Sequence, residues 1–280
     1  MGSHGFPTDS NFPIAVGGVG GSGTRVIAEL LDRLGVYMGT HFTAASDALW
    51  FTFLFKRLEI LAADDAEFDL LTGALVAALR GGEPLSRDAM RHLADLASRP
   101  RLNHPVEQLQ ASLASMAEAA ARPRGKGRWG WKEPNTHIVI ERLWERLPAL
   151  RYVHVVRNGL DMAFSRNQHQ LRLWGGHVLG DEAPVSPRRS LAYWCAVHRH
   201  LLRLQQRNEG RMYWLDFDAL CLDPRRHVAG LLRFLGFPVD AVDTGALGIE
   251  PQPAKYSSGC LGDFAPADIA FVRSLGYASP

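Results

Sequence analysis

The stretch Gly17-Gly18-Val19-Gly20-Gly21-Ser22-Gly23-Thr24-Arg25 decides the fold of this chain. It follows a short apolar run, Ile14-Ala15-Val16, which predicts a buried strand. After Thr24 the apolar residues recur at the spacing of a helix: Ile27, Leu30, Leu31 and Leu34. A strand, a glycine loop and a helix in this order favour a phosphate site, because backbone N–H groups and the helix dipole attract an anion.

One position separates this loop from that of most nucleoside triphosphatases. A Walker A loop has lysine after its last glycine, followed by serine or threonine. Here Thr24 and Arg25 follow Gly23, so ATP or GTP hydrolysis is disfavoured. A P-loop kinase of a small molecule, a catalytically inactive nucleotide-binding protein and a glycine-rich turn without a ligand are the alternatives that remain.

Strand and helix signals alternate through the rest of the chain, apart from one Ala- and Leu-rich segment. Strands are expected at 129–132, 152–156 and 212–215, and helices at 136–147, 160–173, 188–207, 226–235 and 266–275. A loop is expected at 251–263. Residues 49–122 predict three or four helices. This order predicts an α/β fold, in which helices flank a mainly parallel P-loop-type sheet that carries an α-helical insertion.

Bulk composition narrows the class of protein. The 280 residues carry a net charge of only +2, which argues against a nucleic-acid partner held by general basicity. No apolar run approaches the roughly 20 residues of a membrane span. Three widely spaced cysteines without a CxxC pair indicate reduced thiols and a cytoplasmic location. We expect one domain over 13–280, with 49–122 as a helical insertion or acceptor-side segment, after a flexible tail at 1–12.

Three expected strands end in groups that suit an anion. The first ends at the glycine loop, the second at Lys132 and the third at Arg157. In open parallel sheets ligands bind at the carboxyl ends of the strands, so these groups are predicted to converge.

The glycine loop with its amphipathic helix resembles the 5′-phosphosulfate loop of PAPS-dependent sulfotransferases, nearest to their carbohydrate and bacterial members. The resemblance implies that six loop residues bind the donor PAPS and the product PAP: Gly20, Gly21, Ser22, Gly23, Thr24 and Arg25. Arg157 and Ser165, expected inside the next helix, match the family's 3′-phosphate motif. Arg157 could instead simply pair with Asp161. Together, the two motifs distinguish PAPS from ATP, which has no 3′-phosphate.

A late stretch, Lys255 to Phe264, is faintly similar to the family's C-terminal loop over the 3′-phosphate. On this resemblance Ser258 and Gly259 would join the cofactor-binding residues. A plain surface loop is the alternative interpretation.

The resemblance also assigns the chemistry. Many members carry a cation where Gly21 stands here, so Lys132, in a Trp-Lys-Glu-Pro element similar to the family's Lys-x-Pro, is expected to stabilise the leaving group. Asp47 is expected to take the proton of the acceptor, ahead of His41, although Asp47 could be only a helix N-cap. The hypothesis is sulfuryl transfer from PAPS to a hydroxyl of a small-molecule or carbohydrate acceptor, releasing PAP and needing no metal.

Overall fold

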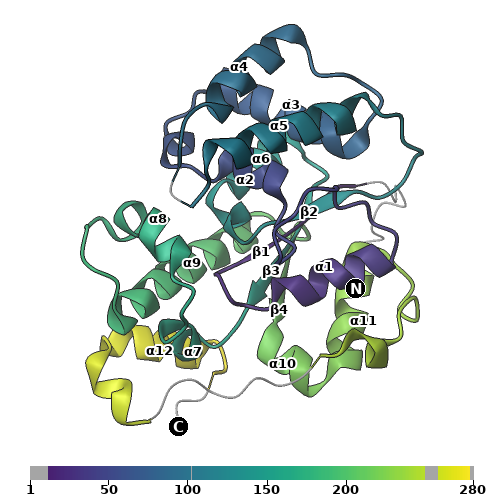
Figure 1. The fold of residues 1–280 in the computed structure, drawn as a ribbon. Helices are drawn as coiled ribbons and strands as arrows, with labels where there is room; N and C mark the ends of the chain where they lie inside the picture. The colour runs from purple at the N-terminus through teal and green to yellow at the C-terminus, as the bar shows by residue number, and fades with distance from the viewer. Residues whose placement is uncertain (1–11, 102, 250–257, 278–280) are drawn as a thin grey trace. The chain divides into compact units, whose positions relative to one another are not determined.

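A computed structural model describes residues 12–101, 103–249 and 258–277, in which strands alternate with helices (Figure 1). The strands are β1 (Ile14–Gly18), β2 (Gly130–Lys132), β3 (Arg151–Val156) and β4 (Met212–Asp216). They form one sheet in the order β2-β1-β3-β4, with β1 parallel to β2 and β3 parallel to β4. The mainly parallel α/β sheet expected from the sequence is therefore confirmed.

The chain divides into two compact units. The first contains the start of the chain up to Val16 together with Ile27–Arg151, and the second contains Gly17–Val26 together with Tyr152 onward. The expectation of one domain over 13–280 stays a prediction. No helix in the described residues is long and apolar enough to cross a membrane.

The first unit holds the helical segment. Its helices are α2 (Leu49–Phe55), α3 (Asp65–Arg80), α4 (Arg87–Ala97) and α5 (Val106–Ala121), with a 3₁₀ turn at Leu58–Leu61. Aromatic rings fix α2 in the core, because Phe51 stacks on Trp131 of β2 at 5.9 Å between centroids and Phe55 packs on Phe68 at 5.4 Å. These helices agree with the three or four expected for residues 49–122.

One predicted helix of this unit is wrong in detail. Instead of a single helix over 136–147, the structure has a 3₁₀ helix (Pro134–Ile138) followed by α6 (Ile140–Arg146). The Glu133 carboxylate accepts a hydrogen bond from the Asn135 N–H and so caps a turn that starts at Pro134. Val139, at φ −120°, then separates the two helices.

The second unit contains the start of α1 (Thr24–Arg33) and the remaining helices: α7 (Gly159–Ala163), α8 (His169–Leu179), α9 (Pro187–Arg207), α10 (Phe217–Leu222), α11 (Pro224–Leu235) and α12 (Pro266–Ser274). The long helix α9 packs against α7, α8 and α12. Short 3₁₀ helices lie at Thr244–Leu247 and Ser258–Asp263. The loop predicted at 251–263 is thus helical from 258 onward, and residues 250–257 lie outside the described part.

The single helix predicted at 160–173 is also wrong, since α7 and α8 are separate. The Gln168 side-chain amide donates to the carbonyl oxygens of Met162 and Ser165, at 3.1 and 2.8 Å. These bonds satisfy carbonyls that a continuous helix would have used, so the chain turns between residues 164 and 168.

Two glycine substitutions in the first unit should have opposite effects. A Cβ on Gly130 would overlap the carbonyl of Ile14 on the paired strand, so Gly130→Ala should lower the free energy of unfolding by about 2 kcal/mol or more. A Cβ on Gly73, in the middle of α3, meets nothing within 4 Å, so Gly73→Ala should raise it by about 0.5–1 kcal/mol. Urea denaturation of both variants measures the two changes. Equal effects would contradict the close approach of β1 to β2.

Candidate functional site

The glycine loop lies in the second unit, in close contact with its neighbours. A Cβ on Gly17 would lie 2.6 Å from the Tyr152 hydroxyl oxygen, and one on Gly18 would lie 2.5 Å from the Val155 carbonyl oxygen. A Cβ on Gly23, which has φ +91°, would overlap the Phe217 ring. The loop therefore needs glycine for packing and for backbone conformation at once.

Gln170 holds this loop from α8. Its side-chain oxygen accepts from the Gly20 N–H at 3.2 Å, and its amide donates to the Gly18 carbonyl at 3.1 Å. Both bonds are buried, so they fix the path of the loop over three residues. Gln170 is a site residue that the sequence did not reveal, because a glutamine at the start of a helix carries no pattern of its own.

Two buried groups, one in the loop and one directly after β3, have hydrogen-bonding capacity that the protein does not use. Ser22 is only 2% exposed, and its hydroxyl has no hydrogen-bond partner. Arg157 is 5% exposed, and neither its Nε nor its Nη2 makes a hydrogen bond. Leaving such donors unpaired costs free energy, so both groups are able to bind a ligand.

Arg157 nevertheless has acidic neighbours. Its guanidinium nitrogens lie 3.7 Å from an Asp161 carboxylate oxygen and 3.6 Å from one of Asp218, beyond hydrogen-bond distance. Burial raises the pKa of Asp218, although the N–H of Asn158 and the charge of Arg157 oppose the shift. Arg157 and Asp161 thus form the ion pair of the alternative interpretation, but the pair is loose. The Nε and Nη2 of Arg157 still have donors for a ligand.

Ser165 lies next to the glycine loop, although it is not inside a helix as the sequence predicted. It lies after the end of α7 rather than inside a helix, and its hydroxyl accepts from the Asn167 N–H at 3.2 Å. A Cβ on Gly21 would lie 3.5 Å from the Ser165 hydroxyl oxygen, so the glycine loop and the second motif meet here. Gly21 itself has φ +88°, a conformation that disfavours the lysine or arginine found there in many sulfotransferases.

The other predicted cofactor-binding residues are placed as follows. Thr24 is buried at the first position of α1, whereas Arg25 is exposed on the same turn. Ser258 and Gly259 begin the 3₁₀ helix Ser258–Asp263, and their side-chain surroundings fall outside the described structure. In the second unit Ser165 therefore lies beside Gly21 of the loop, and Arg157 lies buried beside Asp161 and Asp218.

A second cluster forms in the first unit around Lys132. This side chain is 2% exposed, which excludes an ordinary surface lysine. Its ammonium group donates to the carbonyl of Ala45 at 2.6 Å and to the carboxylate of Asp47. The N-cap of α2 is Ala48, without a side-chain cap, so the interpretation of Asp47 as a helix N-cap is wrong.

Glu133, which the sequence analysis did not assign, extends this cluster. It is fully buried, and its carboxylate accepts from the backbone and side-chain amides of Asn135, at 2.5 and 2.8 Å. The Lys56 ammonium lies 3.6 Å away. Burial raises the pKa of Glu133, while Lys56 lowers it and Asp47 raises it further. Its position beside Lys132 was the only signal for it in the sequence.

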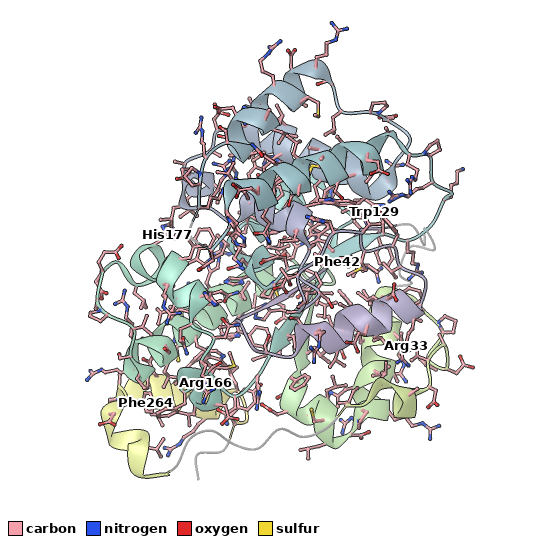
Figure 2. All side chains as sticks on the ribbon, viewed as in Figure 1. Arg33, Phe42, Trp129, Arg166, His177 and Phe264 are labelled. Carbon is pink, nitrogen blue, oxygen red and sulfur yellow. The ribbon has the colours of Figure 1, made fainter. Side chains whose placement is uncertain are left out.

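Lys132 also borders a cavity of about 230 Å³ in this unit. Met38, Phe42 and Ser46 line the same cavity, and Phe42, labelled in Figure 2, is 40% exposed. His41 belongs to this segment. Its Nε2 is buried without a hydrogen-bond partner, and burial lowers the pKa of the ring, which keeps it neutral at neutral pH.

The register of the sheet aligns Lys132 with the residue before the glycine loop. Lys132 pairs with Val16 in the β1–β2 ladder, and Val16 immediately precedes Gly17. The residue expected to supply the cation is thus aligned with the last residue before the glycine loop.

Comparison with known proteins gives a family match and a fold likeness. The family described as "Sulfotransferase family" matches residues 13–241. Curated proteins give no significant match. The structure is similar to a sulfotransferase from Alicyclobacillus acidocaldarius, with a TM-score of 0.50 and 18% identity over 96% of this chain and 97% of the other. The sulfotransferase domain of the Synechococcus PCC 7002 olefin synthase gives a TM-score of 0.46 and 16% identity, covering 97% and 98% of the two chains.

Gln170→Met should loosen the loop without removing a group that touches an anion. Both buried hydrogen bonds would be lost, so we expect the affinity for PAP to fall by about tenfold, equivalent to roughly 1–1.5 kcal/mol. Isothermal titration calorimetry with PAP measures this change. Gln206→Met, at an exposed position of α9, is the matched control. An unchanged affinity in Gln170→Met would show that the loop keeps its shape without this brace.

Proposed function

The chain belongs to the sulfotransferase family, and we propose that it moves a sulfuryl group from PAPS to a hydroxyl of a small-molecule or carbohydrate acceptor, releasing PAP. The observation that carries the proposal is the pair of buried, unsatisfied groups formed by Ser22 in the glycine loop and Arg157 after β3. Two such groups suit a ligand with two separate phosphates, as PAP has. ATP offers no phosphate at the 3′ position.

In this proposal the loop and the start of α1 hold the 5′ end of the donor. The Ser22 hydroxyl and the positive end of the helix dipole at the start of α1 would face the 5′-phosphate, whereas the Gly20 N–H stays bonded to Gln170. Arg157 and Ser165 would hold the 3′-phosphate, and a guanidinium suits a phosphate because it presents a planar fork of donors. Ser258 and Gly259 are proposed to join them from the C-terminal 3₁₀ helix.

The transfer itself needs a cation and a base. The acceptor oxygen attacks sulfur, the bond from sulfur to the 5′-phosphate oxygen breaks, and the acceptor proton passes to a base. Lys132 is the proposed cation for the leaving oxygen, since its buried ammonium has one donor beyond those given to Ala45 and Asp47.

Asp47 is the proposed base and His41 the second candidate. The Asp47 carboxylate contacts the Lys132 ammonium, so a proton gained by Asp47 would weaken its hold on the lysine just as negative charge develops on the leaving phosphate. His41 is neutral at neutral pH because burial lowers its pKa, so it can also accept a proton.

The cavity beside Lys132 is the proposed place for part of the acceptor. Its volume of about 230 Å³ and its walls of Met38 and Phe42 suit a compact group with an apolar or sugar face. Ser46 adds a hydroxyl at its edge.

Binding and transfer assays test the proposal together. Thermal unfolding should shift upward with PAP and PAPS more than with ATP and Mg²⁺, because only the first two carry a 3′-phosphate. Labelled PAPS should then pass its label to at least one hydroxyl acceptor of a small-molecule and carbohydrate panel. Strong stabilisation by ATP and Mg²⁺ with none by PAP would support a kinase. Binding of PAP without transfer to any acceptor would support an inactive nucleotide-binding protein.

Lys132→Ala should separate chemistry from binding. Loss of a cation used on the leaving group should lower kcat by about 100-fold or more, with a change of less than threefold in the affinity for PAP. Lys132→Arg should restore part of the rate because the charge remains. Single-turnover transfer and calorimetry measure the two quantities. A large loss of PAP affinity with an unchanged kcat would contradict the proposed role.

A further inference from the structure

A second and larger cavity lies elsewhere in the first unit. Its volume is about 590 Å³, and it is lined by the later turns of α3 and by residues 124–129 between α5 and β2. Tyr37, Arg146 and Leu147 complete its wall. The proposed transfer chemistry uses none of these residues.

The cavity is strongly basic. Five cations line it against two acidic residues: Arg80, Arg124, Lys126, Arg128 and Arg146 against Asp69 and Glu83. Arg146 and Asp69 neutralise each other, because they are bonded at 2.6 Å, and Arg146 also bonds to Asp65. A positive potential this concentrated, in a protein of net charge +2, favours an anionic ligand.

Two donors in the wall lack partners. Thr72, in the middle of α3, is only 4% exposed, and its hydroxyl makes no hydrogen bond. The Nη1 of Arg124 is likewise buried without a hydrogen-bond partner. A helical threonine usually satisfies its hydroxyl on the preceding turn, so Thr72 indicates a place where a ligand oxygen can bind.

The segment between α5 and β2 is held by hydrogen bonds at residues 122 and 124 and has space around it at residues 125–127. Arg122 accepts from the Gly82 N–H through its carbonyl at 3.1 Å, and Arg124 donates to the Ala119 carbonyl at 3.3 Å. The Arg124 guanidinium stacks 3.8 Å above the Tyr37 ring. A Cβ on Gly125 or Gly127 would meet nothing within 4 Å, so Lys126 stands on a loop with room around it.

The walls also offer apolar surface. Val76, Leu147 and the rings of Tyr37 and Trp129 line the cavity, with Trp129 labelled in Figure 2. A ligand that satisfies both the cations and these walls carries an anionic group on a planar apolar body.

This cavity is distinct from the Lys132 cluster within the same unit. Trp129 immediately precedes β2, whereas Lys132 is the last residue of that strand. The cavity therefore lies at the amino end of β2, and the proposed transfer chemistry lies at its carboxyl end.

We propose that this cavity is a second ligand site, which binds a small organic anion made of a planar apolar body and a phosphate, sulfate or carboxylate group. Arg124 and Lys126 contact the anionic group, Thr72 donates to one of its oxygens, and Tyr37 and Trp129 contact the body. The site stands independently of sulfuryl transfer, because it shares no residue with the glycine loop or the Lys132 cluster.

Calorimetry with naphthalene-2-sulfonate, an aromatic body carrying one anionic group, tests the proposal on the full chain. The double variant Arg124→Gln/Lys126→Gln should lower its affinity by about tenfold or more, and Thr72→Val by about fivefold. The neutral naphthalene-2-methanol should bind the original protein at least about tenfold more weakly.

Arg122→Gln is the matched control. Arg122 directly follows α5, is exposed and pairs with Glu118 at 2.8 Å, but does not line the cavity, so its variant should change the affinity for the probe by less than about twofold. Thermal unfolding checks that each variant remains folded. The proposal is overturned if Arg122→Gln loses as much affinity as the double variant, if the neutral probe binds equally well, or if PAP displaces the probe.

Discussion

The backbone of the glycine loop lies too close to its neighbours to carry side chains at three positions. Tyr152 and Val155 of β3 exclude a Cβ at Gly17 and Gly18, and the ring of Phe217 excludes one at Gly23. The chain can leave β1 and enter α1 only along this path, which sets the positive end of the α1 dipole directly after the loop. Glycine loses much entropy on folding, so such a segment persists where packing and a ligand together compensate for that loss.

Buried charge is handled differently in the two clusters. Arg157 sits near two carboxylates but hydrogen-bonds to neither through its Nε or Nη2, so a phosphate can take these donors without breaking a bond. Lys132 is bound more completely, by Ala45 and Asp47, and has one donor left. The first arrangement favours tight binding of an anion. The second favours a response to charge that develops during the reaction.

The sequence predicted the fold better than the side-chain partners. Short apolar runs predicted the strands that lead to the glycines, to Lys132 and to Arg157. The alternation of strands and helices along the chain then predicted a parallel sheet. Ser165 was misplaced because the side chain of Gln168, with no periodic signal, ends α7 early. The sequence did not reveal Gln170 and Glu133 for the same reason. Their side chains bond to backbone that is distant in the chain or irregular, which leaves no periodic pattern. The roles assigned to Lys132, Asp47 and His41 remain predictions.

The central claim is that the second unit holds two phosphates, one at the glycine loop and one at Arg157. The most direct test compares the dissociation constants of PAP and AMP, which differ only by the 3′-phosphate, for the original protein and for Arg157→Ala. The account predicts that the original protein binds PAP at least about tenfold more tightly than AMP, and that Arg157→Ala loses most of this preference while its affinity for AMP stays the same. A preference for PAP that survives in Arg157→Ala would contradict it.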